Sequence, residues 1–290
     1  MREDNPLIRF GPAGNSDRFY REGRKASEQA PAWLADLGLN AYEYSAGHGV
    51  SLGESTGRRI GEAAARTGIR VSLHAPYYIN CCQDAPGRAQ KNIDYLLAAA
   101  AAVDWMGGDR VVFHVGTPGK LPRAEAFSRA AAVLAQARRA LDGAGLGHVL
   151  LCPETMGRPS QLGTLDEVIA LCRADERMVP TLDFGHLHAA GGGALRSPAA
   201  FERVLTALID GLGTERSRAF HAHFSRIEYT AKGERRHMTF ADQGYGPDFA
   251  HLAPLLVKHR MEPTIICESR GTQADDAIAM RDLYAAALRR

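Results

Sequence analysis

The feature that most constrains the fold of this chain is an alternation, repeated eight times, of a short apolar segment and a longer helical one. The apolar segments predict strands at Leu7–Phe10, Ala41–Tyr44, Arg70–His74, Arg110–His114, His148–Glu154, Val179–Asp183, Ala219–Phe224 and Thr264–Glu268. The helical segments predict helices at Ala26–Leu37, Gly53–Thr67, Arg88–Met106, Arg123–Leu141, Leu165–Arg173, Pro198–Leu212, Phe249–Lys258 and Gln273–Leu288. Eight strands that are each followed by a helix are typical of a closed parallel barrel.

We therefore expect the α/β class and a (β/α)8 TIM barrel that forms a single domain over residues 1–290. The length agrees, since such barrels run to about 250 residues. With 45% hydrophobic and 23% charged residues, the chain can bury a large core. The main alternative is a doubly wound open sheet, which usually has a glycine-rich first turn of the form G-x-G-x-x-G. The first turn here reads FGPAGN, which favours the barrel.

Composition also limits the compartment and the partners. The net charge is only +2, so any contact with nucleic acid must come from a local basic patch. The five cysteines form no C-x-x-C pair, and their odd number is typical of a reducing compartment. The segment MREDNPLIRF has no apolar signal core, and no apolar run approaches the ~20 residues of a membrane span. We expect a cytoplasmic protein that does not contact membranes.

Side chains of the kinds that bind metals lie at the C-terminal ends of most predicted strands. They are His74, His114, Glu154, Asp183, His186, His221 and Glu268, with His237 in the loop after the seventh strand. In a barrel, these strand ends open onto one face, where active sites lie. We therefore expect these side chains to converge on one bowl.

The ligand types and their number point to more than one ion. Imidazoles and carboxylates together suit zinc, manganese, iron or cobalt. One zinc takes about four or five ligands, so this set predicts two or three ions, with Glu154 as a bridging ligand. Closely spaced ions suit hydrolysis of a phosphodiester, because they activate water and hold the attacked and departing oxygens. Glu154 is the expected catalytic residue, since it can also orient the attacking water.

The seventh strand offers two histidines, His221 and His223. Because side chains alternate along a strand, we expect one of them to face the barrel interior and the other to face the helices. We assign His221 to the metals, with the reverse choice left open.

At these residues the sequence resembles the endonuclease IV family of apurinic/apyrimidinic endonucleases, over nearly the whole chain. The segment SLHAPYYIN resembles the family's H-x-x-Y-x-x-N signature, and FHVG resembles the strand that bears the second histidine. PETMGRPSQLG resembles the E-T-x-G segment, LDFGH keeps the D-x-x-H spacing, and ICES supplies Glu268. HAHFS resembles the H-x-N-D segment but has His223 and Phe224 where Asn and Asp are usual. The chain thus resembles a divergent branch of that family.

The resemblance implies a (β/α)8 barrel with a cluster of zinc ions. By this likeness His74, His114 and Glu154 hold the first ion, and Glu154, Asp183, His221 and Glu268 hold the second. His186 would hold the third ion together with an Asp-x-His pair. The segment KGERRHM provides His237 but no Asp two residues before it, so either Glu234 replaces the aspartate or the site holds two ions.

The resemblance also implies a substrate and its contacts. The partner would be double-stranded DNA that contains an abasic site, cleaved 5′ to the lesion to leave a 3′-hydroxyl. Tyr77 and Asn80 of the signature, and Arg226, Arg235 and Arg236 after the seventh strand, are candidate substrate-binding residues. A sugar without a base is also easily extruded from the duplex. We expect a monomer.

Two other functions remain open. A sugar isomerase or epimerase of the xylose-isomerase-like group would need only Glu154, Asp183, His221 and Glu268 around one ion, often manganese or cobalt. It would need no histidines on the third and fourth strands, so His74, His114 and His186 favour the nuclease. A barrel that binds metal or DNA without catalysis is the third alternative, because the motif on the seventh strand is altered.

Overall fold

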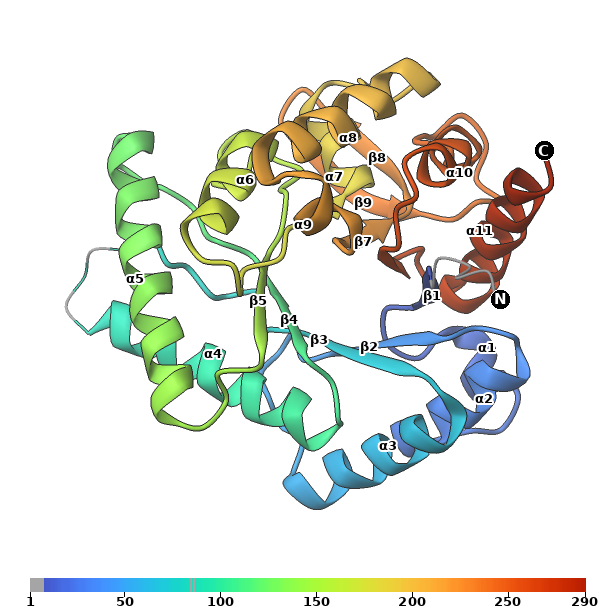
Figure 1. Cartoon of the computed structure of the whole chain (residues 1–290), viewed down its shortest axis with the longest axis horizontal. Coiled ribbons are helices and arrows are strands. Elements are labelled where there is room, and N and C mark those ends of the chain that lie inside the picture. Colours follow the sequence, from blue (N-terminus) through green and yellow to red (C-terminus); the bar gives the residue numbers. More distant parts are fainter. Residues whose placement is uncertain (1–7, 84, 86) are drawn as a thin grey trace.

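The computed structural model describes residues 8–83, 85 and 87–290, and its parallel strands are surrounded by helices (Figure 1). The barrel strands are β1 (Arg9–Pro12), β2 (Ala41–Ser45), β3 (Arg70–His74), β4 (Arg110–Phe113), β5 (Leu150–Pro153), β6 (Thr181–Asp183), β7 (His221–Phe224) and β10 (Thr264–Cys267). Leu7, where the first predicted strand begins, lies outside the described residues. Several strands end earlier than predicted, so His114, Glu154 and Glu268 lie just beyond them.

The eight strands close into a cylinder. Parallel ladders join β2, β3, β4 and β5 in one group and β6, β7, β10 and β1 in another. A parallel bridge between Ala13 and Glu43 links β1 to β2, and one between Glu154 and Thr181 links β5 to β6. The predicted (β/α)8 TIM barrel is confirmed.

The covering helices correspond to those predicted from the sequence. They are α2 (Ala30–Asp36), α3 (Glu54–Thr67), α4 (Arg88–Trp105), α5 (Arg123–Gly143), α6 (Leu165–Ala174), α8 (Pro198–Leu212), α10 (Phe249–Lys258) and α11 (Gln273–Leu288). Helix α3 ends at Gly68, whose φ of 70° suits a residue without Cβ. Helix α6 begins at a capping box, in which the Thr164 and Glu167 side chains each accept from the other's backbone N–H.

Short elements absent from the sequence prediction connect the main ones. They are α1 (Asp17–Arg21), α7 (Phe184–Ala190) and α9 (Thr214–Arg218), whereas the 3-10 helix η1 (Ser27–Gln29) forms the start of the predicted helix Ala26–Leu37. The segment after β7, predicted as a loop, is instead an antiparallel hairpin of β8 (Arg226–Thr230) and β9 (Gly233–Met238). The backbone N–H of Glu234 donates to the Gly157 carbonyl at 2.9 Å, so this hairpin packs on the loop after β5.

Polar side chains occupy part of the barrel interior, whereas apolar side chains fill the space between strands and helices. Glu43 on β2 contacts Ser72 on β3 and the histidines of β7 across the barrel. At the opposite end, the buried Arg110 guanidinium donates to the carbonyl oxygens of Ala219 and Phe220. None of the helices in the described part of the chain is both long and apolar enough to span a membrane.

Candidate metal centre

The C-terminal ends of the strands surround a bowl of about 440 Å³. The residues that line it come from almost every strand end and from the hairpin: Ala13, Ser45, Gly47, His74, Tyr77, His114, Glu154, Met156, Arg158, Gln161, His186, Glu234, His237 and Glu268. Six of the eight predicted metal ligands, and the candidate replacement Glu234, are among them. The convergence expected from a barrel therefore occurs.

The carboxylate of Glu154 lies at the centre of this bowl. Its Oε2 atom lies 3.2 Å from Nε2 of both His74 and His114. Its Oε1 atom lies 3.1 Å from Nδ1 of His223 and 3.4 Å from Nδ1 of His186. One buried carboxylate thus contacts imidazoles from four different strand ends, which is the arrangement that a bridging ligand requires.

Besides an overlapping set of His74, His223 and Glu268, the described residues form three groups of possible ligand atoms around the bowl, each within the reach of a single ion. They are His74 with His114 and Glu154, then Glu154 with Asp183, His223 and Glu268, and finally His186 with Glu234 and His237. The second group is almost fully buried, whereas the other two are partly open to solvent. Apart from one histidine, these are the groups that the sequence resemblance implies.

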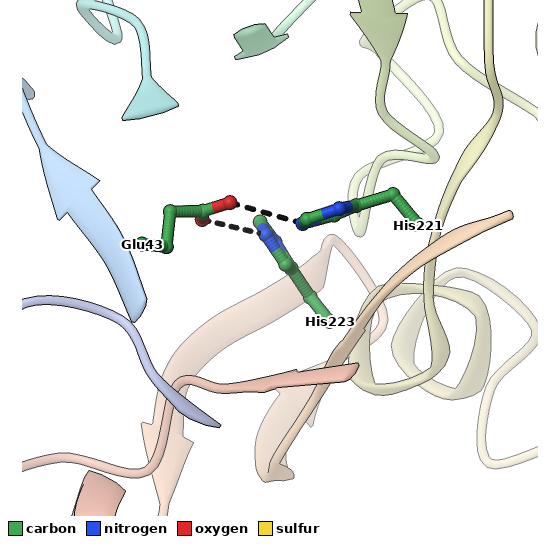
Figure 2. Close-up of side chains that lie close together, drawn as sticks. All are labelled: Glu43, His221 and His223. Atoms are coloured by element: carbon green, nitrogen blue, oxygen red, sulfur yellow. Dashed lines mark hydrogen bonds and ion pairs between the residues drawn. The ribbon is translucent and has the colours of Figure 1, made fainter. Parts of the chain in front are cut away.

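The exception is the choice between the two histidines of β7. The expectation that His221 and His223 face opposite sides of the strand was wrong, because residues two apart in a strand share a face. Both point into the barrel, where they contact the same carboxylate, Glu43 (Figure 2). His223 is the one that reaches the bowl, with Nδ1 3.1 Å from Glu154 and 3.4 Å from Glu268. His221 lies one layer deeper, and it is absent from the group that contains Glu154.

Glu43 is a buried residue of this centre that sequence reasoning missed. Its Oε1 accepts from Nε2 of His223 at 2.8 Å, and its Oε2 accepts from Nε2 of His221 at 3.0 Å and from the Ser72 hydroxyl at 2.8 Å. Burial opposes its ionisation, but His223 and His221 hold the pKa of this carboxyl well below its usual range. Burial lowers the pKa of His221 to about 4, so this ring is neutral. A carboxylate in the middle of a predicted apolar strand was the available signal.

Glu234 reaches the centre from the start of β9. Its Oε2 lies 3.3 Å from Nε2 of His186, and His237 on the same strand is held by a 2.8 Å contact between its Nδ1 and the Ser225 hydroxyl. The glycine at position 157 permits this approach, since a Cβ there would lie 2.6 Å from Cβ of Glu234. The carboxylate that the third group needs is therefore present, three residues before the histidine rather than two.

The electrostatics of the bowl are those of a site that attracts cations. Burial disfavours charge on His74, but the Glu154 carboxylate outweighs it and raises the pKa of His74 to about 9. Burial is likewise outweighed at His223, where Glu268, Glu43 and Glu154 raise the pKa well above its usual value. Burial raises the pKa of Glu268, and repulsion from nearby carboxylates adds to this. Protonated histidines here offset carboxylates that a divalent ion would otherwise neutralise.

One buried atom beneath the bowl fits a bound cation. Asp183 caps helix α7, with Oδ1 accepting from the His186 backbone N–H at 2.7 Å. Its Oδ2 is buried and has no hydrogen-bond partner among the described residues, and Nδ1 of His186 lies 3.4 Å from it. Such an unsatisfied carboxylate oxygen is costly, and this one belongs to the group with Glu154, His223 and Glu268. The residues present therefore fit a bound divalent ion.

Of the two predicted substrate-binding residues in the H-x-x-Y-x-x-N segment, only Tyr77 lines the bowl. Tyr77 stands at the rim of the bowl with 59% of its surface exposed. The Asn80 side chain instead ties two loops together, since Oδ1 accepts from the backbone N–H groups of Cys82 and Thr117. Arg158, which the sequence analysis did not single out, also lines the bowl.

The basic residues of the β8–β9 hairpin lie outside the lining of the bowl. Arg235 and Arg236 both bind the Glu228 carboxylate, at 2.7 and 2.5 Å, while Arg226 donates to the carbonyl of Asp242 at 2.6 Å. None of the three is among the residues that line the bowl. Their role in binding substrate stays a prediction.

Comparison with known proteins identifies the family. Residues 31–288 match the family described as xylose isomerase-like TIM barrel. The chain belongs to this family. The chain is 28% identical over 248 residues to an uncharacterised protein of Methanocaldococcus jannaschii, covering 86% of this chain and 88% of that protein. It is also 27% identical over 170 residues to a probable endonuclease 4 of Acholeplasma laidlawii, where the match covers 57% of this chain and only 56% of the relative.

Several solved structures superpose over almost the whole chain. Endonuclease IV from Thermus thermophilus matches with a TM-score of 0.66 and 20% identity, covering 92% of this chain and 96% of that one. An L-ribulose 3-epimerase matches with a TM-score of 0.69 and 17% identity, covering 98% and 96%. These likenesses establish the shared barrel, and they include both nucleases and sugar epimerases.

Proposed function

We propose that this protein is a metal-dependent phosphodiesterase that cleaves DNA 5′ to an abasic site and leaves a 3′-hydroxyl. The observation that carries the proposal is the presence of three ligand groups around one bowl, two of which share Glu154. Zinc is the proposed ion, and manganese, iron or cobalt would fit the same ligand types. The 27% identity to a probable endonuclease 4 supports the same activity.

The chain's own residues would divide the work between holding ions and orienting the phosphate. His74 and His114 hold one side of the Glu154 carboxylate, and His223 holds the other. Bound divalent ions would supply Lewis-acid stabilisation of the charge that develops on the phosphodiester oxygens. The burial of Glu154 and Asp183 keeps these ligands fixed and excludes competing water from their inner sides.

The rim of the bowl provides the contacts for the rest of the substrate. The exposed ring of Tyr77 offers a face for the extruded sugar or the neighbouring bases, and Arg158 offers a charge for a phosphate. An abasic nucleotide costs little to extrude, and a sugar without a base fits a small bowl where a normal nucleotide would clash. Selection would therefore rest on size and ease of extrusion.

The direct test is to incubate the purified protein with a duplex that carries one abasic site. We expect a single nick 5′ to the lesion, its loss on treatment with a chelator, and its recovery on addition of zinc. A duplex without the lesion is the control substrate. Absence of chelator-sensitive nicking would refute the activity and leave the fold unaffected.

A variant tests the role of Glu154. Glu154→Gln should abolish nicking because the amide cannot bridge two ions, while the protein remains folded by circular dichroism. The matched control is Glu125→Gln, which alters a carboxylate paired with Arg129 on the exposed surface of α5. Near-normal activity of Glu154→Gln would contradict the bridging role.

The second candidate is a sugar isomerase or epimerase, favoured by the buried group of Glu154, Asp183, His223 and Glu268. A single ion in that group would polarise a ketose while carboxylates move a proton. Mass spectrometry of the purified protein separates the two functions: one tightly bound ion per chain supports the isomerase, and two or three support the nuclease.

A further inference from the structure

We propose that Glu43 is a positioning residue for the metal centre: it fixes the ring of His223 so that Nδ1 is the atom presented to an ion. The inference rests on the metal centre of the proposed function and extends it to a residue outside the bowl. Glu43 does not line the bowl, and its side chain is fully buried beneath it.

The two ring nitrogens of His223 have different partners. Nε2 donates to Oε1 of Glu43 at 2.8 Å, whereas Nδ1 faces Glu154 at 3.1 Å and Glu268 at 3.4 Å. A neutral imidazole carries a proton on only one nitrogen. In the neutral ring that binds an ion, a proton held on Nε2 by Glu43 therefore leaves the lone pair of Nδ1 directed at the carboxylates where that ion would lie. A carboxylate behind a ligating histidine sets its tautomer and orientation in this way.

The Glu43 carboxylate is itself held in place by neighbouring side chains. Its Oε2 accepts from the Ser72 hydroxyl at 2.8 Å and from Nε2 of His221 at 3.0 Å, so both oxygens are occupied. Figure 2 shows the carboxylate of Glu43 directed at both histidine rings, with one oxygen toward each. The role of His221 follows from this geometry, since it restrains Glu43 instead of entering the bowl.

An alternative is that Glu43, His221 and His223 are themselves a metal site. The three side chains come close enough to bind one ion. Each histidine, however, already contacts Glu43 directly at hydrogen-bond distance, and His223 Nε2 would have to leave the carboxylate to bind an ion. All three side chains are fully buried. The two Nε2 contacts satisfy both oxygens of Glu43 without an ion, whereas Nδ1 of His221 has no hydrogen-bond partner among the described residues.

The test measures zinc affinity in metal-free protein by competition with a chromophoric chelator. In Glu43→Gln, the amide is a weaker acceptor and places an NH₂ group opposite a donor. We expect the affinity for one ion to fall by roughly 10- to 100-fold. The control Arg138→Met removes a buried charge on helix α5, whose guanidinium donates to the carbonyls of Val149 and Gly147, and its affinity should stay within about twofold of wild type. Thermal unfolding of the metal-free variants shows which remain folded. If Glu43→Gln fails to fold, Ser72→Ala serves instead, because it removes one hydrogen bond to Glu43. We expect it to lower the affinity for the same ion by a smaller factor.

A double-mutant cycle shows whether Glu43 acts through His223. If it does, Glu43→Gln adds little to the loss already caused by His223→Ala, whereas independent effects would add. In zinc-loaded wild-type protein labelled with ¹⁵N-histidine, NMR should show His223 with a proton on Nε2 and the ion on Nδ1. Additive losses, or a Glu43→Gln variant with wild-type affinity, overturn the inference while the metal centre stands. A wild-type protein that binds no divalent ion overturns both.

Discussion

The Oε2 atom of Glu234 lies 3.3 Å from Nε2 of His186, so the β8–β9 hairpin and the start of helix α7 meet at one point of the bowl. His186 occupies that point because Asp183 caps the helix through the His186 backbone N–H. Glu234 reaches it because its own backbone N–H is bound to the carbonyl of Gly157. Three separate segments thus build the third group of ligands.

Removal of the Glu234 carboxylate should cost the protein one ion. In Glu234→Ala, His186 and His237 remain without an anionic partner, and the affinity of two neutral imidazoles alone is low. We expect the number of ions per chain, counted by mass spectrometry, to fall by one. The matched control is Glu228→Ala on the same hairpin, whose carboxylate binds Arg235 and Arg236 and should leave the count unchanged. Equal counts in the two variants would show that Glu234 is not a ligand.

A methyl group at position 157 should disturb the same ion without removing any ligand. The Cβ of Gly157→Ala would lie 2.6 Å from Cβ of Glu234 and 2.9 Å from its Oε2, so the hairpin must shift. We expect weaker zinc binding at one site and a loss of about 1–3 kcal/mol in the free energy of unfolding. Gly53→Ala is the control, because a Cβ at that position meets nothing within 4 Å. Unchanged zinc affinity in Gly157→Ala would contradict the close approach.

Metal binding should release protons near neutral pH. Glu154 raises the pKa of His74 to about 9 in the metal-free protein, where burial alone would lower it. The ring is therefore protonated at pH 7 and must lose its proton to bind an ion. Affinity should rise by up to about tenfold per pH unit from pH 6 and level off above about pH 9. Calorimetry in buffers of different ionisation enthalpy measures the release, and His74→Gln should release fewer protons. A proton count that is the same in both proteins would rule out His74 as the source.

Two arginines should differ in their effect on DNA binding. Arg158 lines the bowl and, among the described residues, donates only through Nε, to the Glu234 carbonyl at 3.2 Å, whereas the guanidinium of Arg235 is paired with the Glu228 carboxylate at 2.7 Å. In Arg158→Ala we expect weaker binding of an abasic duplex. The slope of log affinity against log salt concentration should also become shallower by about one unit, which corresponds to the loss of one phosphate contact. Arg235→Ala should bind nearly as wild type does. Fluorescence anisotropy at several salt concentrations measures both, and the opposite ranking would move the phosphate contact to the hairpin.

The local pattern of the chain was sufficient to predict the barrel. Short apolar strands covered by helices follow from hydrophobic periodicity, and the caps at Gly68 and Thr164 act within a few residues. Polar residues at the strand ends had to share one face, because parallel strands point the same way. His74, His114 and Glu154 were found on this ground, and their contacts agree with it. Their role as ligands stays a prediction.

The contacts of His221, His223 and Glu43 were decided only by the tertiary structure. Periodicity tells which face of a strand a side chain occupies, but residues two apart share that face and stand about 6.6 Å apart along the strand. Which of them meets a given partner depends on how far each strand is staggered against its neighbours. That stagger places His223 beside Glu154 and Glu43 beneath it. The path of the hairpin that brings Glu234 to His186 likewise depends on packing against a loop more than seventy residues earlier, which no local pattern encodes.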